Sequence, residues 1–279
     1  MAQTVEIFPR MKKIYKKLFK SQRFAGLNKA ILVALIDFYA KMQRFNFPVK
    51  YAWDWKLEML LKRYEADTVK VFKNIIKPGM TVIDIGAHIG YYTKLFAKLV
   101  GRKGHVYAFE ASEDNFNILK KNVSRFPQVK LFNQAVTDHV GTVDFYLVSN
   151  RTGCHSVVFS SASTKISVPA ITIDQFVIDQ NIKSIDAIKI DIEGGESLAF
   201  AGMRDLFMSK NKFSIITEFN PDAIKDSNIS PKDFLDNVQV NGFEIYIISD
   251  SGETQRTDID GILNHRVGYT SYNLLLVKN

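Results

Sequence analysis

The stretch TVIDIGAHIGYYT, from Thr81 to Thr93, decides how the rest of the chain is interpreted. Its first four residues, Thr81 to Asp84, have the pattern of a buried strand that ends on an acid. A turn that contains Gly86 and Gly90 follows, and Tyr91 to Val100 has the periodicity of a helix. A strand, a glycine turn and a helix N-terminus form the arrangement that holds the polar part of a nucleotide-like ligand.

The spacing of the two glycines indicates which ligand this is. A dinucleotide site has the pattern G-x-G-x-x-G, because a pyrophosphate needs close backbone contact. Here Ala87 and His88 follow Gly86, and the next glycine is Gly90, so that pattern fails at its second glycine. A looser turn after an acid suits a ligand with an amino group and a carboxylate, such as S-adenosylmethionine (SAM). The alternative is a glycine turn that only ends a strand.

In a SAM site, Asp84 would bind the amino group, directly or through water, and the loop N–H groups would bind the carboxylate. Gly86 would let the backbone turn sharply and let the ligand approach a surface without a Cβ. A second predicted strand, His105 to Glu110, also ends on an acid, 24 residues after Gly86. An open α/β sheet places such an acid on the ribose hydroxyls. NAD and SAM sites both use this acid, so Glu110 predicts a nucleoside ligand without choosing between them.

Composition and charge limit the class of protein. The 279 residues fit one large α/β domain with an extension, and a 46% hydrophobic content is ample for a core. Cys154 is the only cysteine, which excludes an intramolecular disulfide and fits a reducing compartment. We see no signal peptide, and the longest apolar run, Ala30 to Ile36, is too short to span a bilayer. We therefore expect a cytoplasmic protein.

The net charge of +8 is unevenly placed. Residues 1–78 have 17 Lys and Arg against 6 Asp and Glu, or +11, and residues 79–279 have 20 against 23, or −3. The basic segment is thus an N-terminal extension, and the slightly acidic remainder is the predicted catalytic domain, which argues against a nucleic-acid partner. Residues 10–20, RMKKIYKKLFK, predict either a surface helix packed on the domain or a helix that lies peripherally on anionic lipid.

The rest of the extension predicts two more helices, over residues 27–44 and 57–76, separated at Pro48. Between them lie three aromatic residues, Tyr51, Trp53 and Trp55. They either cover an acceptor pocket as a lid or pack the extension against the domain. From Pro78 onward, strands and helices alternate, which predicts a parallel sheet. The further elements are a helix over 112–125, strands over 129–135, 187–190 and 213–217, helices over 174–180 and 231–239, and a final antiparallel pair over 243–249 and 272–278.

Residues 142–173 interrupt this alternation. The segments 142–148 and 165–171 predict strands, and a polar loop between them contains Arg151, Cys154, His155 and Ser156. A histidine in such a loop near the carboxyl edge of a sheet is a candidate base or substrate ligand. The alternative is a histidine exposed to solvent.

Acids crowd the end of the strand over 187–190, which continues as Asp191-Ile192-Glu193-Gly194-Gly195-Glu196. Such crowding is costly unless something uses it. The candidate uses are a divalent metal bound by Asp191 and another acid, a base for an acceptor hydroxyl, or recognition of the sulfonium or of sugar hydroxyls. The alternative, acids that suit a helix dipole, fits Glu196 better than Asp191. Glu218 follows the next strand and adds another acid at this edge.

Six blocks in this order resemble the FkbM family of SAM-dependent methyltransferases over about residues 79–279: VIDIGAHIGYYT, YAFEASEDNFNILKKNV, NQAVTD with GTVDFYLV, GCHSV, AIKIDIEGGE and ITEFNP. The resemblance implies an α/β class I fold: a seven-stranded, mostly parallel sheet with helices on both faces and its last strand antiparallel. To this the chain adds a helical extension, residues 1–78, and a small β insertion. It also implies SAM as methyl donor and a hydroxyl oxygen as acceptor.

Carried over by position, the donor would be held by Asp84, Gly86 and Glu110, with Ala87, His88, Gly90 and Ala111 beside them. Three residues depart from the usual family pattern: His88 replaces Asn, Ala111 replaces Pro, and Gly195 replaces Ala. None of these removes a carboxylate, although His88 changes the loop that would contact the methionine moiety.

The resulting hypothesis is an O-methyltransferase with Asp191 or His155 as the base and Glu193, Glu196 and Glu218 binding the acceptor. No metal is assigned. A sugar or glycan, lipid-linked in view of the basic extension, is the preferred acceptor, and a small secondary-metabolite hydroxyl is the alternative. The rivals from other classes are a NAD-dependent oxidoreductase and a non-catalytic SAM- or membrane-binding module. The sequence leaves the oligomeric state open.

Overall fold

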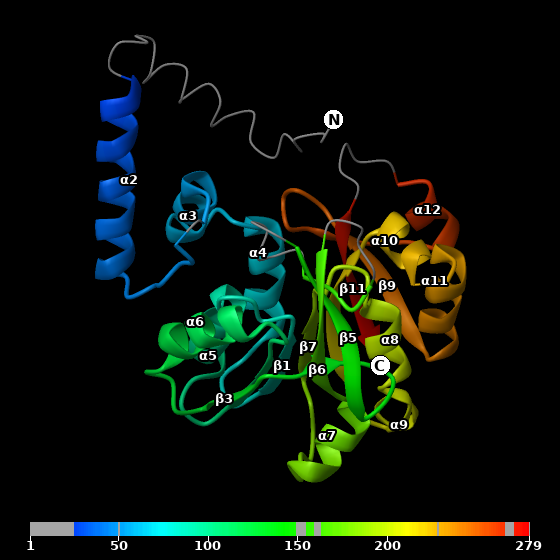
Figure 1. Cartoon of the computed structure of the whole chain (residues 1–279). Helices are drawn as coiled ribbons and strands as arrows, with labels where there is room; N and C mark the ends of the chain where they lie inside the picture. Colours follow the sequence, from blue (N-terminus) through cyan, green and yellow to red (C-terminus); the bar gives the residue numbers. More distant parts are fainter. Residues whose placement is uncertain are drawn as a thin grey trace.

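The structure of the chain is a computed structural model, and it describes residues 25–49, 51–148, 155–158, 163–227, 229–265 and 271–278 (Figure 1). The basic segment 10–20 and two of the loop residues singled out above, Arg151 and Cys154, lie outside the described residues. Within these ranges, none of the helices combines the length and the apolar character that crossing a membrane requires.

A central sheet organises the fold, with the strand order β10-β9-β11-β8-β7-β1-β2-β3. Five strands, β1, β2, β3, β7 and β8, run parallel to their neighbours, and β11 runs antiparallel between β8 and β9. The expected mostly parallel sheet with an antiparallel last strand is therefore confirmed, and a short edge strand, β10, is added to it. The bounds are β1 (Thr81–Ile85), β2 (His105–Phe109), β3 (Val129–Phe132), β7 (Ala187–Ile190), β8 (Phe213–Phe219), β9 (Phe243–Ile248), β10 (Thr254–Arg256) and β11 (Tyr272–Lys278).

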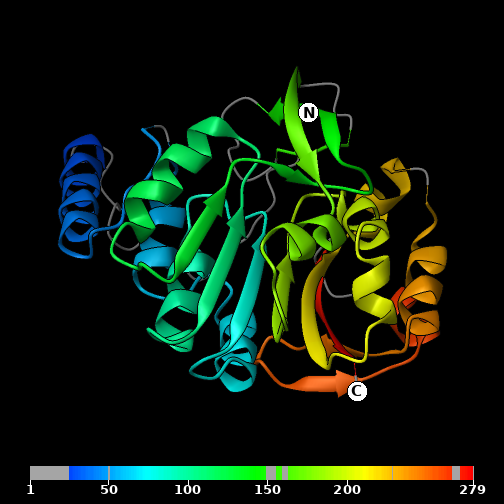
Figure 2. The ribbon, with the colours of Figure 1, turned by 90° about the horizontal axis from the view of Figure 1, so that it is seen from below.

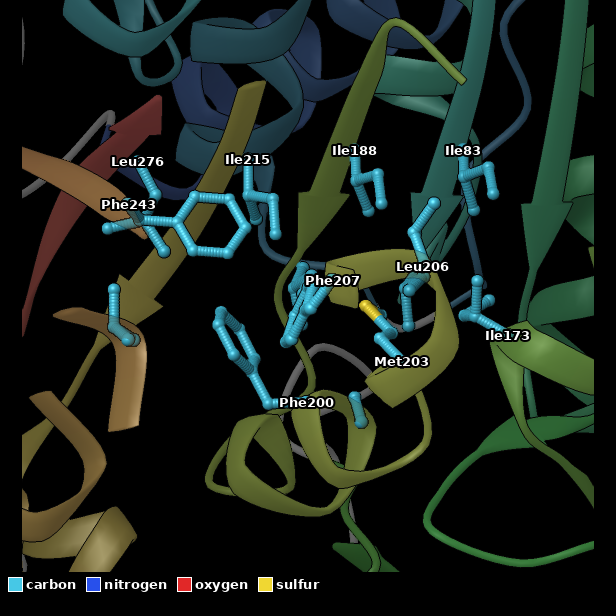
Figure 3. Close-up of a cluster of buried hydrophobic side chains, with 14 of the residues drawn as sticks. Ile83, Ile173, Ile188, Phe200, Met203, Leu206, Phe207, Ile215, Phe243 and Leu276 are labelled. Carbon is cyan, nitrogen blue, oxygen red and sulfur yellow. The ribbon is translucent and has the colours of Figure 1, made fainter. Parts of the chain in front are cut away.

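Helices cover both faces of this sheet, as Figures 1 and 2 show. One face packs against α4 (Ala66–Ile75), α5 (Tyr91–Val100) and α6 (Glu113–Val123). The other packs mainly against α7 (Ile173–Asp179), α8 (Glu196–Ala201), α9 (Arg204–Met208), α11 (Pro231–Val240) and α12 (Ile259–Leu263), with α10 (Pro221–Asp226) beside them. Figure 3 shows how Phe200, Met203 and Phe207 fill the space under Ile188 and Ile215 of the sheet. Because both faces are buried, β1 (TVIDI) and β7 (AIKI) are mostly apolar, with one charged residue each, Asp84 and Lys189.

The β insertion forms a second sheet with the order β4-β6-β5. Its strands are β4 (Ala135–Val136), β5 (Gly141–Val148) and β6 (Ser163–Ile171). The single strand expected over 129–135 is therefore wrong, since β3 ends at Phe132 and Ala135 already pairs with β6. Between the two strands, the Asn133 side chain donates to the backbone oxygens of Glu110 and Ala111, which holds the chain as it leaves the central sheet.

The single helix expected over 57–76 is also wrong, because the chain breaks between α3 (Trp53–Leu60) and α4. Lys62 and Glu65 adopt left-handed conformations, with φ of 58° and 43°, which no α-helix accommodates. Trp53 and Trp55 lie inside α3 rather than before it. The first described helix, α2 (Ala25–Met42), packs on α3 and stands away from the sheet (Figure 1).

The α4 helix belongs to the same core as the sheet. Val71 and Phe72 of α4 are buried with Val82 of β1 and Phe96 of α5. The domain boundary expected at residue 78 stays a prediction. A boundary at that residue would separate α4 from the strands against which α4 packs.

Candidate functional site

The carboxyl ends of β1, β2 and β7 meet at one edge of the sheet, where the glycine turn after β1 lies. The N–H groups of Gly86 and Ala87 both donate to the Phe109 oxygen of β2, which holds the turn against that strand. Gly86 has φ of 80°, and a Cβ there would overlap the backbone oxygen of Asp191. The backbone after β7 fills the space that a Cβ would take, so a contact within the protein already requires glycine here; approach of a ligand to Gly86 stays a prediction.

Gly90 is likewise required by a contact within the protein. It has φ of 89° at the start of α5, and a Cβ would lie 2.7 Å from Cδ1 of Leu119 on α6. Glycine thus allows both the left-handed conformation and the close packing of the two helices. That Gly86, Ala87 and Gly90 also bind the donor stays a prediction.

Glu110, directly after β2, is buried and holds the loops around it. Its Oε2 accepts the N–H of His88 at 2.8 Å, and its Oε1 accepts the N–H of Ser112 at 2.9 Å and the side-chain amide of Asn115 at 3.4 Å. Burial raises the pKa of Glu110 to about 7, against these hydrogen bonds, which favour the charged form. The carboxyl therefore links the glycine turn to the start of α6, next to Ala111.

Asp84 has no exposed surface and lies beside a lysine that the sequence interpretation missed. Its Oδ2 accepts the hydroxyl of Thr93 at 2.6 Å, and its Oδ1 lies 3.9 Å from Nζ of Lys189 on the neighbouring strand. Burial raises the pKa of Asp84, and the ammonium of Lys189 opposes that rise. Oδ1 accepts no hydrogen bond from the residues that the structure describes, and contact between Asp84 and a ligand stays a prediction.

Lys189 links Asp84 to the acids that follow β7. Its Nζ lies 3.1 Å from Oδ2 of Asp191 and 5.0 Å from the ring centroid of Tyr92, whose hydroxyl donates to Glu65 at 2.6 Å. Lys189 is only 4% exposed. A lysine within the otherwise apolar strand AIKI was the signal that could have identified it, because a buried charge needs a partner.

The acids Asp191, Glu193 and Glu218 come together at this edge. Ile190 of β7 pairs with Thr217 of β8, so Asp191 and Glu218 are the next residues on adjacent strands. Glu218 lies inside β8, not after the strand as expected. Each of the three offers a carboxylate oxygen within 4.8 Å of the other two.

Glu193 reaches this group through a left-handed turn, with φ of 54°. Ser156 of the insertion donates its hydroxyl to the Glu193 backbone oxygen at 2.8 Å, so the second sheet holds the acidic loop in place. Burial and then repulsion from Asp191 and Glu196 raise the pKa of Glu193 to about 8. Ser156 was noted only as a loop residue in the sequence.

Glu196 is turned inward and is 1% exposed. Its Oε1 accepts the N–H of Ile192 at 3.1 Å, while Oε2 has no hydrogen-bond partner among the residues that the structure describes. Burial raises its pKa to about 7. Its place at the start of α8 matches the alternative of an acid at a helix N-terminus, and binding to an acceptor stays a prediction.

The ring centroid of His155 lies 6.3 Å from that of Phe145 on β5. Nδ1 of His155 accepts the N–H of Val148 at 3.0 Å, so in the neutral ring the proton is on Nε2. Burial lowers the pKa of His155, and burial also lowers the pKa of His88, to about 4. A neutral His155 can therefore donate through Nε2 but has no free lone pair for a proton.

Together these groups form an acidic edge beside a glycine turn. Carboxylates there can accept hydrogen bonds from hydroxyls, take up a proton or bind a cation. Lys189 is the partner that the structure gives to Asp191 in this group, through the contact at 3.1 Å.

Comparison with known proteins adds three findings. Residues 84–245 match the model of the Methyltransferase FkbM domain. The chain is 25% identical over 195 residues to the 2-O-methyltransferase NoeI of Sinorhizobium fredii, covering 62% of this chain and 79% of that protein. It is 25% identical over 183 residues to the hexuronic acid methyltransferase AglP of Haloferax volcanii, covering 64% of this chain and 69% of that protein.

Among solved structures, an O-methyltransferase from Bacillus cereus in complex with SAH is similar over 96% of this chain and 97% of that chain. The two share 12% sequence identity, and the TM-score is 0.47.

Proposed function

The chain belongs to the FkbM family of methyltransferases, and on this premise we propose that it transfers the methyl group of SAM to a hydroxyl of a sugar or glycan. The observation that carries the proposal is the pair of relatives, one named a 2-O-methyltransferase and the other a hexuronic acid methyltransferase. Both align over more than half of this chain, and the matched family region, residues 84–245, includes the glycine turn and the acidic edge.

In this proposal Glu110 binds the ribose diol of the donor. It is the acid after β2, and its carboxyl is already placed by His88 and Ser112, which limits its movement. The turn after β1 lies beside the donor carboxylate, although the N–H groups of Gly86, Ala87 and His88 already donate within the protein, and Asp84 acts on the amino group. The donor's methyl group would then face the ends of β7 and β8.

The acceptor oxygen attacks the methyl carbon in line with the C–S bond. As the C–O bond forms, the C–S bond breaks, and its electron pair stays on sulfur, which becomes a neutral thioether. The hydroxyl proton passes to the Asp191 carboxylate. We prefer Asp191 to His155 for this role, because the Val148 N–H already occupies Nδ1 of His155. His155 instead donates from Nε2 to the acceptor, and Glu193, Glu196 and Glu218 bind its hydroxyls.

The function is tested with labelled SAM and three acceptors: a hexuronic-acid glycan, the same glycan on a lipid, and a small phenol. Label should appear on the glycan, and mass spectrometry of the product should place it on oxygen. Calorimetry with S-adenosylhomocysteine, with NAD as the comparison, tests the donor site independently. Binding of NAD alone, or transfer to the phenol alone, would contradict the proposal.

Peripheral contact with a membrane is the second part of the proposal, and α2 supports it. Leu35, Phe38 and Met42 lie one turn apart on α2 and are 60%, 63% and 66% exposed. Residues 1–24 just before this helix contain 7 Lys and Arg against 1 acid. An apolar face next to a basic segment is the pattern of a protein that lies on anionic lipid, where a lipid-linked glycan would be found.

Vesicle co-sedimentation at low salt tests this contact. Vesicles with anionic lipid should bind the protein, and vesicles of neutral lipid should bind it less. Phe38→Ser should weaken binding, whereas Val240→Ser, which changes an 87% exposed valine on α11, should not. Equal binding of vesicles by both variants would show that α2 does not contact the membrane. A dimer in solution that depends on Phe38 would show that a second copy of the chain covers this face of α2.

A further inference from the structure

Three carboxylates from separate parts of the chain converge at the acidic edge. Asp191 follows β7, Glu218 lies in β8 and Glu193 comes from the left-handed turn between them. Their oxygens lie within 4.8 Å of one another. Like charges at this distance repel, so the fold holds them together against an electrostatic cost.

The distances match the coordination of a metal ion. Oxygen ligands lie about 2.0–2.1 Å from Mg²⁺ and about 2.3–2.6 Å from Ca²⁺, so two oxygens on one ion are at most about 4.2 Å apart for Mg²⁺ and about 5 Å apart for Ca²⁺. The three oxygens of Asp191, Glu193 and Glu218 lie within 4.8 Å of one another, which satisfies the larger limit. An all-oxygen set selects Mg²⁺, Mn²⁺ or Ca²⁺ rather than zinc or copper.

Two buried oxygens provide an independent sign that this cluster lacks a partner. Oε2 of Glu218 and Oε2 of Glu196 are buried and have no hydrogen-bond partner in the described part of the chain. Glu196 is 1% exposed, and its Oε1 accepts the N–H of Ile192 at 3.1 Å. Ile192 lies between Asp191 and Glu193 in the chain, so this bond holds the Glu196 carboxyl next to the cluster. Buried polar atoms normally have partners, so these two need an explanation.

When ionised, Asp191, Glu193 and Glu218 place three negative charges at one edge of the sheet. Lys189 neutralises part of this charge, but it contacts Asp191 on the side of Asp84. Protonation of the acids is one way to relieve the remaining repulsion, and a bound cation is the other.

We propose that Asp191, Glu193 and Glu218 bind one divalent cation that prefers oxygen ligands, with Glu196 next to them in the chain as a hydrogen-bonding acid. This rests on the proposed function, in which the acceptor hydroxyl comes to the same edge. A hydroxyl bound to the cation has a lower pKa, so its proton leaves more readily during methyl transfer. The sequence alone led us to assign no metal, because the position of Glu218 beside Asp191 depends on the pairing of the strands.

The test uses Mn²⁺ as the probe, with the full chain saturated with S-adenosylhomocysteine. Electron paramagnetic resonance of free Mn²⁺ measures binding directly. One Mn²⁺ per chain should bind, Mg²⁺ should compete, and Glu218→Gln should weaken binding at least tenfold. Glu253→Gln, which changes an exposed acid near β10, should bind Mn²⁺ as the unchanged protein does. Thermal melting shows that each variant is folded.

The proposal is overturned if the folded protein binds no Mn²⁺, or if Glu218→Gln binds it with unchanged affinity. Methyl transfer in EDTA separates this failure from failure of the proposed function. If transfer is complete in EDTA and no Mn²⁺ binds, the proposed methyl transfer is supported and the cation site is refuted. If Mn²⁺ binding depends on Glu218 but no glycan is methylated, the cation site is supported and the proposed glycan acceptor is refuted.

Discussion

Affinity for the donor should rise with pH because Glu110 must be charged to accept hydrogen bonds from a ribose diol. Its pKa of about 7 means that only about one tenth of the protein has the charged form at pH 6, against about nine tenths at pH 8. If the ligand binds only that form, S-adenosylhomocysteine should bind about tenfold more weakly at pH 6 than at pH 8.

The unliganded protein should show the opposite trend in stability. The pKa of Glu110 is raised in the folded chain from 4.5 to about 7, so the folded state binds the proton more tightly than the unfolded state. This group therefore stabilises the fold below about pH 4.5, and the stabilisation is lost as the pH rises to about 7. Its size is on the order of 3 kcal/mol. The Asp84 carboxyl is the charged neighbour that adds to the shift.

Calorimetric titration at pH 6, 7 and 8 measures the first effect, and Glu110→Gln isolates it from other groups that titrate nearby. The variant should bind weakly and with a smaller change between pH 6 and 8. Glu253→Gln is the matched control and should keep the full pH dependence. A flat affinity in the unchanged protein, or the same slope in Glu110→Gln, would refute the assignment of Glu110 to the ribose.

Three further predictions concern single residues. Gly86→Ala should lower the melting temperature much more than Gly79→Ala, because both glycines have positive φ but only a Cβ at Gly86 meets backbone atoms; equal losses would remove the steric argument. Lys189→Met should cost about 3–5 kcal/mol in denaturant unfolding, and more at pH 8 than at pH 5, because it leaves buried carboxylates unpaired; a loss independent of pH would contradict this. Asp191→Asn should lower kcat more than His155→Ala, with donor affinity nearly unchanged in both; the reverse order would make His155 the base.

Local patterns predicted those elements whose residues decide their own conformation. β7 and β11 begin and end where their apolar runs indicate, and β1 extends one residue beyond the expected end at Asp84. The break between α3 and α4 could not be predicted this way. Apolar spacing continues through it, and the left-handed Lys62 and Glu65 are held by surrounding structure rather than by their own preference.

The sequence by itself determined the strand–turn–helix unit, the acids at the ends of strands and the family blocks, because these depend on neighbours in the chain. Only the tertiary structure decided what those residues face. The pairing of β7 with β8 brings Asp191 to Glu218, and that of β1 with β7 brings Asp84 to Lys189. It also places the Asp191 backbone where a Cβ of Gly86 would lie. Such contacts depend on strand register and on close packing between distant segments, which no local periodicity specifies.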